Sequence, residues 1–345
     1  MRIINYLGFI LFAITVSCVP AELDNIQAFK YTFPDLEIVD SLPEVAFTEP
    51  VAVVETDGDI IITTDADLLV QDVVAAVIDK NITQENLDVI QAFSETAANV
   101  SDEEIIDGIT EAWILGILDG SIQPSAAFVQ IEAEFEAIPE FAKYFAQLEL
   151  PTIDGFRPGG RLIFDKGEKL KNEFNSRIES LVTPCKEAAE EIYLINIKKL
   201  EDESVVQIQS IRDYYQVFIS QYEQDYAARV IFGTGLIAEN TAELLDFVIF
   251  FNKSIDELDY PNSVKRGLKS YVIAFVLRYR AQQVQWEESF AIAAKFARDK
   301  RIATAIELND EAILNVNSNL KAAILTQTTK YNTATNNCHN QGSGG

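Results

Sequence analysis

Histidine is almost absent from this chain: the only one is His339, close to the C-terminal end. Catalysis by a serine or cysteine nucleophile needs a positioned imidazole as its base, and zinc sites usually need several histidines or cysteines. A metal pair of Cys338 and His339 would leave the coordination shell unfilled. The rest of the sequence carries no recognisable catalytic motif. The sequence therefore predicts a protein that is not an enzyme.

Glycine and proline are also scarce, with 15 and 10 residues among 345. Few turns can be built from so few of them, which favours long helices over many short strands. The chain is not an acidic disordered polymer, because 48% of its residues are hydrophobic and 10% are aromatic. This composition predicts a folded, mainly α protein that is long enough for two domains.

Long apolar runs are missing except at the N-terminus, where Arg2 precedes the apolar stretch Tyr6–Val16. This pattern predicts a signal peptide at residues 1–21, with an apolar segment too short to anchor the chain across a membrane. Small residues up to Ala21 suit a signal peptidase, so the mature chain would begin at Glu22. We therefore expect a secreted, extracellular protein.

The same segment has a second interpretation. Thr15-Val16-Ser17-Cys18 resembles a bacterial lipobox, although Thr15 stands where leucine is usual. Cys18 would then be lipidated and become the first residue of a bacterial cell-envelope lipoprotein. Membrane association is expected only in that case. An uncleaved anchor is a third interpretation.

Cysteine is rare too, and either form of processing leaves only Cys185 and Cys338 as structural thiols. An even number of cysteines in an oxidising compartment predicts one disulfide. Cys185 opens the first long helical stretch and Cys338 follows the last one. In a bundle with an even number of helices those two ends lie together, so the expected bond closes the bundle.

Positive charge is nearly missing from the first half of the chain. Residues 22–150 contain 28 acidic and three basic residues, a net charge of −25, whereas the chain from Pro151 onward has a net charge of −3. Such an acidic excess excludes nucleic acid as a partner, because nucleic acid needs a basic surface. Cations, basic surfaces or plain solubility remain as uses of the acid, and we expect protein partners or self-association.

Residues 22–150 are expected to form an acidic multi-helix domain. Apolar residues recur with helical spacing from Asp65 onward, in four or five helices. One helix is expected to run from a capping box at Ser101 to Gly120. Before them, the β-branched stretches 51–55 and 60–64 flank a turn of Asp and Gly, which predicts a short β-hairpin.

Proline and glycine gather at residues 151–161, where the charge also changes, which predicts a linker. Residues 162–335 are expected to form an elongated antiparallel bundle of long helices, interrupted at Gly233-Thr234-Gly235 and turning back at Pro261. The tail 336–345 is expected to be disordered. Apolar residues with spacings of three and four predict a coiled-coil-like seam at Val205, Ile208, Ile211, Tyr215, Phe218 and Tyr222.

Four acids near the expected hairpin, Asp57, Asp59, Asp65 and Asp67, offer oxygen ligands of the kind that Ca²⁺ prefers. The segment is not an EF-hand, because it lacks the Gly and Glu that such a loop requires. The favoured interpretation is a turn and a helix start with solvated acids. No cofactor is therefore expected, with Ca²⁺ as the alternative.

Three Asn-X-Ser/Thr sequons, at Asn81, Asn99 and Asn252, are candidate glycosylation sites if the source is eukaryotic.

The function expected from these features is non-catalytic: a secreted or surface-tethered structural, scaffolding or binding protein with a charge-separated helical body. The alternative is an extracytoplasmic glycan-binding or carboxylate-dependent hydrolytic module, assisted by calcium. Two carboxylates across a cleft suffice for glycoside hydrolysis, so residue types alone do not exclude it.

Overall fold

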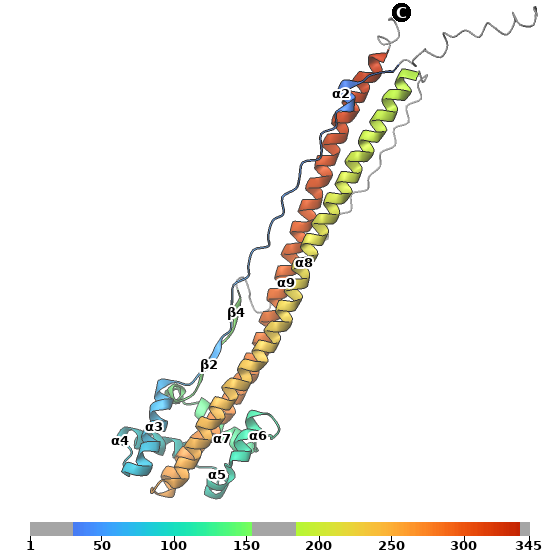
Figure 1. Ribbon diagram of the computed structural model, residues 1–345. Helices are drawn as coiled ribbons and strands as arrows, with labels where there is room; N and C mark the ends of the chain where they lie inside the picture. The colour runs from blue at the N-terminus through green and yellow to red at the C-terminus, as the bar shows by residue number, and fades with distance from the viewer. Residues whose placement is uncertain (1–29, 154–183, 339–345) are drawn as a thin grey trace, which may run out of the picture. The chain divides into compact units, whose positions relative to one another are not determined.

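Two long helices dominate the computed structural model of this chain, which describes residues 30–153 and 184–338 (Figure 1). Helix α8 spans Pro184–Glu257 and helix α9 spans Asn262–Asn336. They confirm the mainly α-helical fold with a helical bundle. The predicted signal peptide, with Cys18, and His339 lie outside the described residues.

The chain divides into two compact units, and both long helices contribute to each. The first unit comprises, of the described chain, residues 30–46, 184–209 and 313–338, and the second comprises residues 47–153 and 210–312.

Within each unit, α8 and α9 run antiparallel. In the first unit the hydroxyl groups of Tyr193 and Thr328 are 3.1 Å apart. In the second, Gln283 Nε2 donates to Thr241 Oγ1 at 3.0 Å. Cys185 also pairs with Cys338 in the first unit, and Asn252 with Lys269 in the second. Within each unit, partner numbers on α9 therefore fall as those on α8 rise, as in an αα-hairpin.

The expected break at Gly233-Thr234-Gly235 is wrong, because α8 continues through it as one helix (Figure 1). A Cβ atom on Gly233 would lie 2.3 Å from the ring of Phe290 on α9. This glycine therefore permits a close approach of the two helices and does not end one. Likewise α9 reaches Asn336, one residue into the expected disordered tail, and residues 339–345 of that tail lie outside the described chain.

The disulfide is confirmed: Cys185 and Cys338 are paired in the first unit, with their Cα atoms 5.8 Å apart. Around them lies a small apolar core that includes Phe33, Leu36 and Ala189. Phe33 precedes the short helix α2, Pro34–Glu37. Helix α2 and the chain after it are held to α8 by polar contacts, since Asn196 donates to the Leu36 carbonyl at 2.6 Å and the Leu42 amide donates to Glu203 at 2.9 Å.

The acidic stretch forms five short helices in the second unit, and each begins at a Ser or Thr whose side chain accepts a backbone amide hydrogen bond. The caps are Thr63, Thr83, Ser101, Thr110 and Ser125. The helices are α3 (Thr64–Asp79), α4 (Gln84–Thr96), α5 (Asp102–Gly108), α6 (Glu111–Leu118) and α7 (Ala126–Glu136), followed by the 3-10 helix η2 (Pro139–Tyr144).

The single helix expected from Ser101 to Gly120 is wrong. It divides into α5 and α6 because Thr110 caps a new helix, with its hydroxyl oxygen accepting from the Trp113 amide at 3.1 Å. The Ser101 cap itself is present, since its hydroxyl accepts from the Glu104 amide at 3.2 Å. The period of the apolar residues was right, but a capping residue inside it interrupts the helix.

The predicted hairpin is also wrong in its pairing. Strand β1 (Glu55–Thr56) pairs with β4 (Thr152–Ile153), and β2 (Asp59–Ile61) pairs with β3 (Gln147–Glu149), both antiparallel. The two ladders share one register, so residues 55–61 lie along residues 147–153 and do not fold back on themselves.

Gly58 lies where this two-stranded ribbon is interrupted. Its φ is +67°, and a Cβ atom there would lie 2.3 Å from the Glu149 carbonyl oxygen. Only glycine tolerates both conditions without strain. The Asp-Gly pair that resembled a hairpin turn therefore serves a close approach between distant segments.

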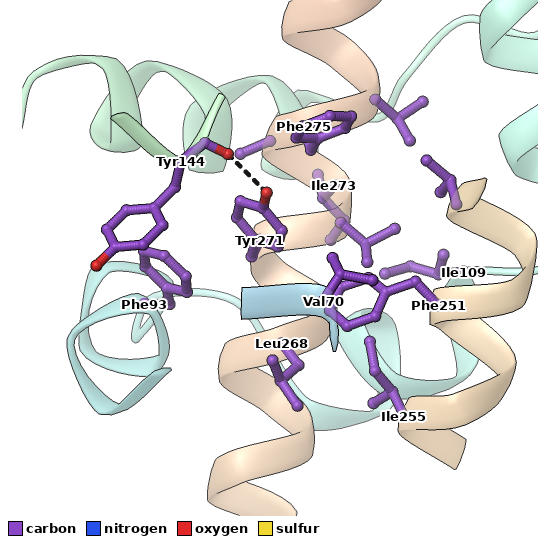
Figure 2. Packing of buried hydrophobic residues seen from close by; sticks show 14 of the residues in the cluster. Val70, Phe93, Ile109, Tyr144, Phe251, Ile255, Leu268, Tyr271, Ile273 and Phe275 are labelled. Carbon is purple, nitrogen blue, oxygen red and sulfur yellow. Dashed lines mark hydrogen bonds between the residues drawn. The ribbon is translucent and has the colours of Figure 1, made fainter. Parts of the chain in front are cut away.

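The main core lies in the second unit and joins the acidic helices to both long helices (Figure 2). Phe93 of α4 stacks on Tyr271 of α9, with ring centroids 5.2 Å apart, and Tyr144 meets Phe93 edge-on at 5.8 Å. Burial raises the pKa of Tyr271, so its hydroxyl stays neutral and donates to the Tyr144 carbonyl at 2.6 Å. Gly267 brings α9 so close to α4 that a Cβ atom would lie 2.1 Å from the Ile90 carbonyl oxygen.

Side chains on both sides of the expected linker therefore share one core. This differs from the expected division into an acidic domain at 22–150 and a separate bundle at 162–335. Residues 154–161 of the linker lie outside the described chain, so the linker stays a prediction. None of the helices in the described ranges has the length and apolarity that crossing a bilayer would need.

Candidate functional site

The four acids considered as calcium ligands are each engaged elsewhere in the second unit. Within the described residues, no three acidic, histidine or cysteine side chains gather as a metal site. Each of them has a side-chain partner outside the set: Arg229 for Asp57, Asn240 for Asp59, Lys143 for Asp65 and Gln71 for Asp67. These contacts spread the four carboxylates over different partners, and the calcium site stays a hypothesis.

We expect calcium to act on this protein only as a screening salt. Self-repulsion among the acids of residues 22–150 opposes folding, and any salt reduces it. Millimolar Ca²⁺ should therefore raise the melting temperature no more than NaCl of equal ionic strength. Differential scanning calorimetry in both salts measures this. A calcium-specific rise that Asp57→Asn with Asp59→Asn abolishes would contradict it, because specific binding stabilises by mass action.

Of the three predicted glycosylation sites, the one at Asn252 is wrong. Its side chain is buried, with the residue 7% exposed, and its amide nitrogen donates to the Ile109 carbonyl at 3.3 Å. Its amide oxygen accepts from Lys269 at 2.8 Å. A glycan would break both bonds and find no room, so Asn252 is not an acceptor in the folded protein. Asn81 and Asn99 are exposed and stay candidates.

A buried lysine on α9 was missed by the sequence analysis. The side chain of Lys269 is 1% exposed, and its ammonium lies 2.7 Å from Asp256 Oδ1 as well as 2.8 Å from Asn252. A buried charge is tolerated only with such partners. The available signal was one lysine near the start of the run 268–277, whose other residues are apolar apart from Ser270. Its contacts are all internal, so it links α8 and α9 and has no open face for chemistry.

The best-defined polar cluster is built around Glu55 of β1. One carboxylate oxygen lies 2.5 Å from Arg301 of α9, and the other lies 3.4 Å from Arg229 of α8. Arg229 also pairs with Asp57 and lies over the ring of Phe290, 4.7 Å from its centroid. Because Glu55 has both oxygens paired with arginines, this cluster fastens the β1 segment to the two helices.

Beside this cluster the surface of the second unit is hollowed, with a volume of about 510 Å³. Tyr222, Tyr226 and Phe232 line it together with Glu55 and the arginines 229, 298 and 301. Arg298 is itself engaged, lying 3.6 Å from Glu223 and 4.6 Å from the centre of the Tyr226 ring.

A further basic residue of α9 fastens the acidic helices. Arg266 pairs with Asp102 at the start of α5 and donates to the carbonyl oxygens of Ala97 and Val100, at 2.5 and 2.6 Å, beyond the end of α4. A cation at the carbonyl oxygens that follow the end of a helix is favoured by the helix dipole. Basic side chains of the long helices thus meet acids of the first half inside one unit.

The clearest unexplained surface lies on α8 in the first unit. Leu194, Ile195, Val205 and Val206 are 57, 62, 64 and 67% exposed. Val205 was expected in the coiled-coil seam, and that prediction is wrong, although Ile211 and Tyr215 of the seam are buried. We call the set Leu194, Ile195, Lys198, Asp202, Val205 and Val206 the α8 stripe.

Comparisons with protein-family models, with curated proteins and with solved structures each find no match to this chain. The function must therefore be argued from these surfaces.

Proposed function

We propose that this chain is a non-catalytic structural or binding protein that acts outside the cytoplasm, either secreted or tethered to the cell surface. The observation that carries the proposal is the α8 stripe, where four branched apolar side chains are more than half exposed. Water-exposed apolar side chains gathered on one helix face are typical of surfaces that dock another protein.

The location outside the cytoplasm is supported by two features. The N-terminal apolar segment has the length and flanks of an export signal. The Cys185–Cys338 pair is of the kind that persists in oxidising compartments. The polar clusters support a structural role, since Glu55 and Lys269 are occupied by internal partners.

Site-specific photocrosslinking in the source cells tests the proposal. A benzophenone amino acid at position 195 or 205 should form crosslinks to protein, and one at exposed Leu325 of α9 should not. Leu325 is the matched control because it belongs to the same unit and is 68% exposed. Retention of the chain in the cytoplasm, or no crosslink from either stripe position, would overturn the proposal.

A second candidate function is glycan binding at the hollow beside Glu55. Its aromatic lining of Tyr222, Tyr226 and Phe232, next to Glu55 and arginines, is the observation that favours it. Calorimetric titration with neutral and acidic oligosaccharides tests it. Binding that Tyr226→Ala abolishes would support a glycan site, and no heat with any of them would remove this candidate.

A further inference from the structure

The α8 stripe is a continuous surface on one side of the helix. Eleven residues make about three helical turns, so Leu194 and Val205 lie on one edge of the stripe, and Ile195 and Val206 lie on the other. Lys198 and Asp202 lie between these edges, and their charged groups are 3.1 Å apart. The residues that pack inward, Asn196, Leu200 and Ser204, lie on the opposite side of the helix and are buried.

The order of chemical groups along the stripe is symmetric about Leu200. An apolar pair comes six and five residues before it, and another comes five and six residues after it. Lys198 lies two residues before Leu200, and Asp202 lies two residues after it. When the direction of the helix is reversed about Leu200, each apolar position of the stripe falls on another apolar position. Lys198 then falls on the position of Asp202.

This symmetry is what a two-fold interface between identical chains requires. In such an interface, a residue that contacts a second residue of the other copy is matched by the reciprocal contact. A two-fold axis perpendicular to α8 makes the helices antiparallel and keeps each edge of the stripe against the same edge of the other copy, with its ends exchanged.

We propose that two copies of this chain associate through antiparallel pairing of their α8 stripes, centred on Leu200. Leu194 packs against Val205 of the second copy, and Ile195 packs against Val206 of the second copy. Lys198 lies against Asp202 of the second copy, so two lysines and two aspartates form one network. The inference rests on the proposed function and names the partner.

The charges favour this direction over the parallel one. A parallel pair about the same centre would place Lys198 against Lys198 and Asp202 against Asp202, and like charges in contact disfavour that arrangement. In the antiparallel pair each lysine has an aspartate on both sides. Each Lys198 is already held by its own Asp202, which reduces the entropy lost when the network forms.

The oligomeric state of the oxidised, full-length mature chain tests the proposal. Sedimentation velocity should show a reversible monomer–dimer equilibrium in the micromolar range, because the interface is small. Ile195→Glu should weaken the dimer at least about tenfold, since it places two carboxylates in the interface. Leu325→Glu, on the other helix of the same unit, should change nothing.

Charge exchange gives the sharper result. Lys198→Asp and Asp202→Lys should each weaken the dimer, because each creates like-charge contacts. The double variant should restore it, since the exchanged charges again alternate. Both substitutions lie at exposed positions, and far-UV circular dichroism of the three variants checks that the helices remain.

A chain that stays monomeric up to about 100 µM, or a dimer unchanged by Ile195→Glu, would overturn the proposal. So would a double variant that dimerises no better than the single ones. If the purified chain is monomeric but position 195 still crosslinks to a different protein, the self-pairing fails and the binding role stands. If the purified chain is monomeric and position 195 crosslinks to no protein, both the self-pairing and the binding role fail.

Discussion

Replacing Cys185 and Cys338 by alanine is expected to lower the stability of the first unit by up to about 5 kcal/mol. The bond joins residues that are 153 positions apart in sequence. In the chain-entropy model, a loop this long gives the largest stabilisation, because the reduced unfolded chain gains the most freedom.

The loss should be local. The first unit has a small core of Phe33, Leu36, Cys185 and Ala189, with a few partly buried neighbours. Without the disulfide, little apolar burial holds the start of α8 to the end of α9. The core of the second unit contains neither cysteine, so its stability should change little.

Hydrogen exchange followed by mass spectrometry separates these outcomes. Amides near both cysteines should exchange much faster in the double variant and in the reduced protein, while amides of α4 and of α9 near Tyr271 keep their protection. Equal exchange near Cys185 in the oxidised protein and the double variant would show that packing alone holds these ends.

Features set by local sequence could be predicted. The mainly helical fold follows from scarce glycine and proline, and a cap such as Ser101 follows from its own neighbours. The disulfide could be predicted because the expected processing leaves two cysteines, and their places at the ends of the helical region fit an even number of helices. An even number is the only condition, and two long helices meet it as well as four would.

Features that depend on a distant partner could not be predicted from the sequence. The stretches 55–61 and 147–153 pair with each other, and nothing near Gly58 distinguishes the turn of a hairpin from a close approach to Glu149. Gly233 was misread for the same reason, because its meaning lies in Phe290 on the other helix. The uneven charge was visible, but its use required knowing that Arg266 and Arg301 reach back to Asp102 and Glu55.

The candidate surface was only partly visible in the sequence. Spacings of three and four placed Val205 in a seam, yet the same spacing fits either side of a helix that is apolar on more than one face. The structure assigns Tyr215 to the inside and Val205 to the outside. The symmetry about Leu200 can be recognised only when the outward residues are known.

Phe93→Ala is expected to lower the free energy of unfolding by about 3–5 kcal/mol. Phe93 is fully buried and contacts the rings of Phe135 and Phe141. It also contacts the rings of Tyr144 and Tyr271 (Figure 2). Removal of its ring leaves a cavity between α4, η2 and α9 that the surrounding rings fill only in part. Phe250→Ala is the matched control, since Phe250 of α8 is 56% exposed and should cost little.

The same variant tests whether the chain before residue 151 unfolds as a separate domain. The chain has two tryptophans, Trp113 in α6 and Trp286 in α9, so variants with one of them replaced by phenylalanine report on each side of the expected linker. Because Phe93 and Tyr271 share one core, Phe93→Ala should shift the denaturant midpoints of both fluorescence transitions together. A shift at Trp113 with Trp286 unchanged would show that the acidic helices unfold independently, and the domain boundary at 151–161 would then hold in spite of the shared core.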